Sequence, residues 1–159
     1  MIYNGNMNDT TDFKSEKAFY VNSCGTTHTR GEFSVIREFG RNDYHILYVI
    51  KGNCYIEKGS SIITLEENDI FIYYPHEMQK YSFDSKENIS HWIHFSGYEV
   101  ENLLTQLNLT AGKHHLNEFN NISVLFNSIQ KEYSAYSIIN DQTNQKAKIL
   151  KIKNGGLLI

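Results

Sequence analysis

A succession of short β-type segments between residues 37 and 97 constrains the fold of this chain more than any other feature. The segments are rich in isoleucine, valine, tyrosine and phenylalanine, and turns of glycine, asparagine, aspartate or serine separate them. Several strands at this spacing predict a mainly β domain, a small sandwich or barrel that can enclose one small ligand. The predicted strands span residues 44–50, 54–57, 61–65, 69–75, 80–83 and 90–95.

The composition is that of an ordinary globular protein. The 159 residues, of which 40% are hydrophobic and 21% charged, suffice for one domain with its own core. The formal net charge of −3 supplies no electrostatic basis for binding nucleic acid. A polar N-terminus and the lack of a long apolar run predict a cytoplasmic protein with no membrane partner. Cys24 and Cys54 fall short of a disulfide framework and are predicted to be reduced, partly buried thiols.

The chain divides into three parts. Residues 1–17 are polar with little periodicity and predict a flexible N-terminal arm. Residues 18–116 form the strand-rich unit, in which a short helix near 98–108 precedes one more strand at 112–116. Residues 117–159 predict a helical region.

The helical region carries an apolar seam. Its apolar residues recur with alternating spacings of three and four, the heptad pattern by which one helix packs along another. The seam either covers the strand-rich unit or pairs with the same helix of a second subunit, and we predict the second arrangement, an antiparallel homodimer. A second helix near 147–152 follows, and the apolar end at 157–159 leads us to expect that the natural polypeptide continues. The predicted dimer interface is Phe119, Ile122, Phe126, Ile129 and Tyr133, and Tyr136 extends the same seam.

Strand alternation selects candidate ligand-binding residues. An arginine, Arg37, shares a strand face with apolar residues, where its guanidinium needs an internal acid or the oxygens of a ligand. Trp92 and His94 share a face with Ser90, and Tyr81 lies on one side of its own strand, so these side chains are predicted to converge on one cavity. An aromatic plane beside hydrogen-bonding groups suits a small polar ligand such as a sugar. Alternatively, Arg37 pairs with an acid at 38 or 57 and Trp92 is plain core.

The seven histidines do not form a metal-ligand pattern. His91 and His94 lie three apart on a predicted strand and so face opposite sides, as do the adjacent His114 and His115. The sequence also lacks a nucleophile elbow, a phosphate-binding glycine loop and a Cys-x-x-Cys motif. We therefore predict no metal, no cofactor, no catalytic residues and no enzymatic activity.

Several segments together match a known family. They span residues 22–25, 37–40, 44–52, 65–75 and 91–97, and the last of them, His-Trp-Ile-His-Phe-Ser-Gly, is the most specific. With them, residues from about 18 to 110 resemble the N-terminal effector domain of the AraC family of bacterial transcription regulators. The resemblance implies a cupin-type β-barrel, a double-stranded β-helix that binds a small effector, often a sugar. It also implies dimerisation helices and then a C-terminal pair of helix-turn-helix motifs, which this sequence lacks.

The resemblance also implies roles for single residues. The ligand arginine of sugar-binding relatives falls on Arg37, the tyrosine after the barrel proline on Tyr81, and the stacking tryptophan on Trp92. A pocket threonine falls on position 26 or 27, of which Thr27 is the candidate. The position two residues before the tryptophan, a histidine in arabinose-binding relatives, is Ser90 here, so the effector need not be arabinose.

These observations predict the sensing and dimerisation part of a transcription regulator. Its expected partners are a small-molecule effector, most simply a carbohydrate, and a second copy of itself. DNA is expected as a partner only through the missing helix-turn-helix domain. Two alternatives stay open: a small cupin enzyme acting on a sugar, such as an isomerase, and a cupin that only supports assembly, whose interior would be filled with side chains.

Overall fold

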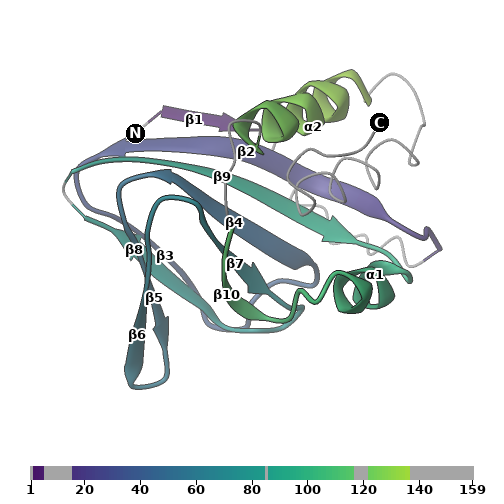
Figure 1. Cartoon of the computed structure of the whole chain (residues 1–159), viewed down its shortest axis with the longest axis horizontal. Helices are drawn as coiled ribbons and strands as arrows, with labels where there is room; N and C mark the ends of the chain where they lie inside the picture. The colour runs from purple at the N-terminus through teal and green to yellow at the C-terminus, as the bar shows by residue number, and fades with distance from the viewer. Residues whose placement is uncertain (1, 6–15, 85, 117–121, 137–159) are drawn as a thin grey trace.

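The chain folds into two antiparallel β-sheets, with two helices packed against the larger one (Figure 1). The computed structural model describes residues 2–5, 16–84, 86–116 and 122–136. Within these residues a six-stranded sheet has the order β1-β2-β9-β4-β7-β10, and a four-stranded sheet has the order β3-β8-β5-β6. The strands are β1 (Ile2–Gly5), β2 (Tyr20–Arg30), β3 (Phe33–Arg37), β4 (Tyr44–Lys51), β5 (Cys54–Lys58), β6 (Ser61–Leu65), β7 (Asp69–Tyr73), β8 (Gln79–Phe83), β9 (Glu87–Ser96) and β10 (Gly112–His115).

The two sheets enclose an interior to which both contribute side chains. Along β3 the half-buried Phe33, Val35 and Arg37 alternate with the exposed Ser34 and Ile36, as the two-residue period of a strand requires. The prediction of a mainly β, barrel-like fold is thereby confirmed. We call the buried apolar residues between the sheets the inner cluster: Leu47, Val49, Cys54, Ile56, Leu65, Phe71, Tyr73, Tyr81, Phe83 and Trp92.

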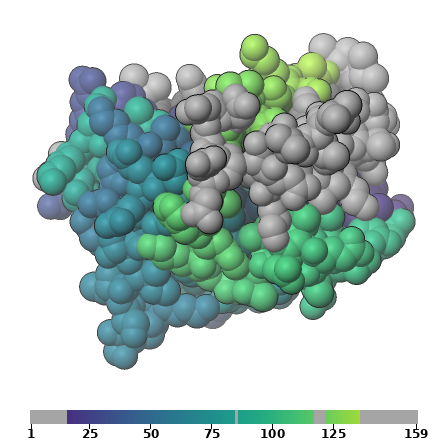
Figure 2. All heavy atoms as spheres, viewed as in Figure 1, coloured from purple at the N-terminus to yellow at the C-terminus, as the bar shows by residue number. Residues whose placement is uncertain are grey.

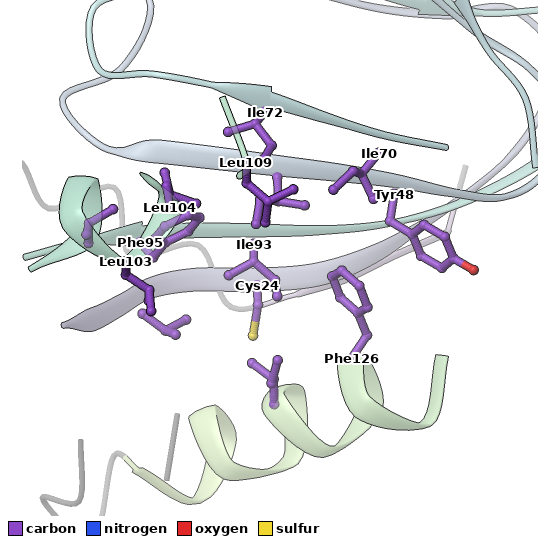
Figure 3. Packing of buried hydrophobic residues seen from close by; sticks show 14 of the residues in the cluster. Cys24, Tyr48, Ile70, Ile72, Ile93, Phe95, Leu103, Leu104, Leu109 and Phe126 are labelled. Carbon is purple, nitrogen blue, oxygen red and sulfur yellow. The ribbon is translucent and has the colours of Figure 1, made fainter. Parts of the chain in front are cut away.

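The opposite face of the six-stranded sheet is also buried. The central strands β4 and β9 are therefore covered on both sides, and nearly all of their residues are buried or half-buried. Figure 3 shows Phe126 of α2 (Ile122–Tyr136) directed at the sheet, where its ring stacks on Tyr48 of β4 at 5.5 Å. The outer cluster comprises Phe19, Val21, Cys24, Ile46, Tyr48, Ile70, Ile72, Ile93, Phe95, Val100, Leu103, Leu104, Leu109, Leu116, Ile122, Phe126, Ile129 and Tyr133.

The apolar seam of α2 packs on the barrel of its own chain. Ile122, Phe126 and Ile129 are at most 1% exposed, and Tyr133 is buried with them in the outer cluster. The prediction that these four residues form a dimer interface is therefore wrong, and the alternative, that the seam covers the strand-rich unit, is confirmed. A heptad seam packs on any complementary apolar surface, and β2 and β9 present one. Phe119, the fifth predicted interface residue, and the predicted second helix lie outside the described residues.

The start of the chain also differs from the prediction. Residues 2–5 of the predicted flexible arm form β1, which pairs antiparallel with β2, Ile2 opposite His28 and Gly5 opposite Gly25. Main-chain groups at the end of the arm are engaged as well, because the Tyr98 amide donates to the Lys17 carbonyl at 3.1 Å. A four-residue strand at a sheet edge is held by backbone hydrogen bonds, and so short a segment shows no periodic apolar signal in the sequence.

The remaining elements follow the prediction. The short helix predicted near 98–108 is α1 (Val100–Gln106), and the predicted strand at 112–116 is β10, which pairs with β7 at the sheet edge. Figure 2 shows the β5–β6 hairpin projecting at the lower end of the molecule, and the β6 side chains there are largely exposed. Among the described helices, neither is long and apolar enough to cross a bilayer.

Candidate functional site

A cavity of about 270 Å³ lies between the two sheets. Small-molecule pockets commonly measure roughly 300–1,000 Å³, so this cavity suits one small ligand. Strands β2, β4 and β9 of the larger sheet and β3 and β8 of the smaller one contribute to its wall. It is lined by Ser23, Thr27, Phe33, Val35, Arg37, Arg41, His45, Tyr81, Trp92 and His94.

Five of the six side chains predicted to bind a ligand line this cavity. Arg37 and Tyr81 come from the four-stranded sheet, Trp92 and His94 from β9, and Thr27 from β2. Their convergence follows from the alternation of side chains, because every second residue of each strand faces the space between the sheets. The predicted convergence on one cavity is confirmed. Ligand binding by these residues stays a prediction.

The sixth candidate, Ser90, does not belong to the cavity wall. Its side chain is 1% exposed, and its hydroxyl has no hydrogen-bond partner. Its neighbours across the sheet are Thr27 of β2 and Val49 of β4. Ser90 therefore shares a strand face with Trp92, as predicted, but lies outside the cavity.

The structure selects between the two adjacent threonines. Thr27 faces the cavity, whereas Thr26 faces α2. The Thr26 hydroxyl lies 2.7 Å from Nδ1 of His91 and accepts a hydrogen bond from the Gln130 side-chain amide at 3.1 Å. Thr27 is therefore the threonine that can reach a ligand.

Aromatic and apolar side chains form one part of the wall. Trp92 lies with its ring centroid 5.6 Å from that of His94, and Tyr81 meets the buried Phe83 edge-on at 6.1 Å. Phe33 and Val35 of β3 complete the apolar part. Planar aromatic surface beside polar groups can accept the C–H face of a small polar ligand.

Two histidines from adjacent strands stack at the cavity. His45 of β4 lies opposite His94 of β9, and their ring centroids are 4.2 Å apart. Both ring nitrogens of His45 are buried and lack a hydrogen-bond partner. Burial, and then the nearby His94 and Arg37, hold the pKa of His45 well below its usual value, so its imidazole is neutral at neutral pH.

A buried carboxylate, Asp43, lies directly behind this histidine pair. Arg41 donates to both carboxylate oxygens, at 2.8 and 3.1 Å, and the Asn22 side-chain amide donates at 2.9 Å. Nδ1 of His94 lies 3.3 Å from Asp43 Oδ1, a close electrostatic contact without the angles of a hydrogen bond. Burial would raise the pKa of Asp43, but His94 and Arg41 outweigh it and hold this pKa below the usual range.

A tight turn after β3 places both arginines beside the cavity. The Gly40 amide donates to the Arg37 carbonyl at 3.1 Å, and Gly40 has a positive φ of 65°. A β-carbon at Gly40 would lie 2.2 Å from the Glu77 carbonyl oxygen, so only glycine fits here. The turn is further fixed by the His76 amide, which donates to the Arg41 carbonyl at 2.7 Å.

Arg37 bonds to an amide side chain and to none of the acids that the structure describes. Its Nη1 donates to Oε1 of the fully buried Gln79 at 2.8 Å. Glu57, one of the acids considered as its partner, instead pairs with Lys80 at 2.6 Å. Within the described part of the chain, no carboxylate lies at ion-pair distance from Arg37. The alternative that Arg37 is neutralised at the rim is therefore wrong.

Three polar residues at the cavity, His45, Arg41 and Asp43, were not among the predicted site residues. His45 lies two residues before the interior residue Leu47 on β4 and therefore on the same face of the strand, so the alternation of side chains could have identified it. Arg41 and Asp43 lie in the turn before β4, where no periodicity marks them. In the described ranges no three histidine, cysteine, aspartate or glutamate side chains gather as a metal site, and His91 faces α2 while His94 faces the cavity.

Comparison with known proteins identifies one family. The model of the AraC-like ligand binding domain matches residues 27–143, most of the chain. No curated protein matches the sequence at a significant level.

The solved structures to which this chain is similar include three bacterial proteins. A cupin-2 domain containing protein from Shewanella frigidimarina is 19% identical, with a TM-score of 0.38 over 55% of this chain and 72% of its own. A putative mannose-6-phosphate isomerase from Ralstonia eutropha is 13% identical, with a TM-score of 0.44 over 60% and 83%. The cupin domain of an XRE family transcriptional regulator from Enterobacter cloacae is 8% identical, with a TM-score of 0.42 over 58% and 93%.

Proposed function

Because this chain belongs to the AraC-like ligand-binding domain family, we propose that it is the effector-sensing domain of a bacterial, cytoplasmic transcription regulator, and that its effector is a carbohydrate. The observation that carries this proposal is the cavity between the sheets, which Trp92 and Tyr81 line together with Arg37 and His94. A cupin that only supports assembly would have a filled interior, and the cavity argues against that reading.

The cavity wall offers partners both for the C–H face of a sugar ring and for its hydroxyl groups. The indole of Trp92 offers a plane on which a pyranose C–H face stacks, and stacking on aromatic rings is favourable for such surfaces. Thr27, Arg37 and His94 supply hydrogen-bonding groups for hydroxyls at other edges of the same cavity. A volume of about 270 Å³ limits the ligand to roughly one monosaccharide unit.

The sheet between the cavity and α2 offers a route by which binding can alter the helix. Tyr133 of α2 donates its hydroxyl to the Asn22 carbonyl, and the Asn22 side chain donates to Asp43, which holds Arg41 at the cavity wall. An effector acts as a switch only if it binds one arrangement of these elements more tightly than another. We infer that the chain works as a homodimer and reaches DNA through a helix-turn-helix domain that follows it in the whole protein.

A small cupin enzyme acting on a sugar is the competing function, and the two differ in what becomes of the ligand. A sensor returns its sugar unchanged, whereas an isomerase converts it. Proton NMR of each binding sugar, followed over hours with the protein, separates them: new sugar resonances would support the enzyme and contradict the sensor.

Thermal unfolding with a panel of mono- and disaccharides tests the proposal. A ligand at about one hundred times its Kd stabilises the fold by roughly 2.7 kcal/mol. The substitution Trp92→Leu keeps an apolar side chain but removes the aromatic plane, and it should abolish most of the sugar-induced shift. The matched control is Phe39→Leu, because Phe39 is an aromatic residue that is 87% exposed and outside the cavity. If a folded Trp92→Leu variant binds the sugar as tightly as wild type, the site assignment is wrong.

A further inference from the structure

The cavity is lined by arginine and histidine side chains but by no carboxylate that the structure describes. Its wall contains the guanidinium groups of Arg37 and Arg41 and the imidazoles of His45 and His94, and no carboxylate side chain is among its lining residues. Asp43, behind the wall, is committed to Arg41, since it accepts two hydrogen bonds from that guanidinium. Asp43 thus balances the charge of Arg41, whereas no carboxylate of the described residues balances that of Arg37.

Most hydrogen-bonding capacity of Arg37 is available to a ligand. A guanidinium has five N–H donors in a planar fork. In the described structure a single protein acceptor, the Gln79 side-chain oxygen, takes one of them. A half-buried guanidinium with no anionic partner is costly, and an oxyanion that accepts two parallel hydrogen bonds from its fork removes much of that cost.

His45 provides a second, independent indication. The side chain is 1% exposed, it lines the same cavity, and neither of its ring nitrogens has a partner. A neutral imidazole has one N–H donor and one acceptor nitrogen, and buried polar groups in folded proteins are normally paired. A ligand oxygen in the cavity can accept the hydrogen bond that the protein leaves unmade.

We propose that the effector is an acidic carbohydrate, whose carboxylate or phosphate binds the Arg37 guanidinium fork beside His45 while its sugar ring stacks on Trp92. This inference rests on the proposed function, because it names the class of sugar that the same cavity recognises. A neutral sugar would leave the Arg37 charge uncompensated, whereas an anionic one pairs it and supplies an acceptor for the imidazole N–H.

Titration calorimetry with matched pairs of ligands tests the charge. Glucose is compared with glucuronate and with glucose 6-phosphate, and galactose with galacturonate, so that each pair differs mainly in the anionic group. We expect at least one acid to bind tenfold or more tightly than its neutral parent. The uronates and the sugar phosphate then tell which oxyanion the site takes.

Two variants test whether Arg37 is the source of the preference for an acidic over a neutral sugar. The substitution Arg37→Gln should lower the affinity for the acidic sugar at least tenfold. It should leave the affinity for the neutral parent sugar within about threefold. The control Arg30→Gln also removes one positive charge, but from a side chain that is 78% exposed and pairs with Glu87 on the surface, and it should change neither affinity. Circular dichroism and the unperturbed Tm establish that each variant is folded.

The outcomes separate this inference from the proposed function. If neutral sugars bind as tightly as their acids, the inference is overturned and the carbohydrate sensor stands. Equal weakening of acid and neutral parent by Arg37→Gln also overturns it, because Arg37 would then recognise hydroxyls. If no sugar of either kind binds the wild-type protein, the carbohydrate function fails and this inference fails with it.

Discussion

The two faces of the six-stranded sheet both carry a cluster of buried side chains but differ in how they are packed. The outer cluster, under α1 and α2, is a continuous apolar packing of sheet and helix side chains (Figure 3). The inner face carries the inner cluster as well, but there the cavity interrupts the packing. Buried polar atoms without a hydrogen-bond partner occur on both faces, in His45, Tyr73 and Ser90 on the inner one and at Nε2 of His91 on the outer one. The outer face is thus packed, whereas the inner face leaves a space between the sheets.

Two histidines on one strand show the contrast most directly. His91 faces outward, where its ring stacks on Phe126 at 4.9 Å and its Nδ1 lies 2.7 Å from the Thr26 hydroxyl. His94, three residues along, faces inward against His45 and Asp43 at the cavity. Both are buried, so burial alone does not mark a functional residue. The two residues differ instead in what surrounds them, which is a helix side chain at His91 and the cavity at His94.

Removing a large side chain from the outer cluster should have the greatest effect. Phe126→Ala deletes a ring that is 1% exposed and packs on Tyr48 and His91, so we expect a loss of about 3–5 kcal/mol in the free energy of unfolding. Urea denaturation measures it. Val124→Ala, at a position of the same helix that is 59% exposed, should cost less than about 0.5 kcal/mol. Equal, small losses would mean that α2 is not anchored on the sheet.

Acidification should destabilise the fold through the buried histidines. Burial lowers the pKa of His91 from 6.5 to about 4, so between these values the unfolded chain binds a proton that the folded chain does not. Stability therefore falls as the pH drops from 7 toward 4, and His91 alone should cost about 2 kcal/mol at pH 5. The lowered pKa values of His45 and His94 act in the same direction.

The variant His91→Phe isolates the outer histidine. Its ring can still stack on Phe126 but cannot take up a proton, so its unfolding free energy should fall less than that of wild type between pH 7.5 and pH 5. Urea midpoints at the two pH values give the difference. An unchanged pH dependence would place the acid sensitivity at the cavity histidines instead.

The smallest effect is expected at Ser90. Its hydroxyl is buried without a partner and lies outside the cavity wall, so Ser90→Ala should be neutral or stabilise the fold by up to about 1 kcal/mol. Ligand affinity, measured by calorimetry, should stay within about twofold of wild type. A tenfold loss of affinity would show that Ser90 does contact the effector, as its strand position first predicted.

Much of the cavity could be predicted because alternation along a strand is a local property. The period of two assigns Arg37, Tyr81, Trp92 and His94 to the interior without knowledge of the partner strands. The same rule applied to β4 would have added His45. It could not separate Thr26 from Thr27, because that choice depends on which side of β2 the helix covers.

The sequence by itself determined the mainly β fold, the short helix and final strand near residue 112, and most of the cavity-facing residues, since strand period and turn residues act over a few positions. Only the tertiary structure decided where the apolar seam of α2 packs, which acid Arg41 holds, and that none of the described acids pairs with Arg37. An apolar stripe specifies that it must be buried but not against which surface, and charge pairing depends on distances between residues remote in sequence. Those distances exist only once the sheets and helices have packed.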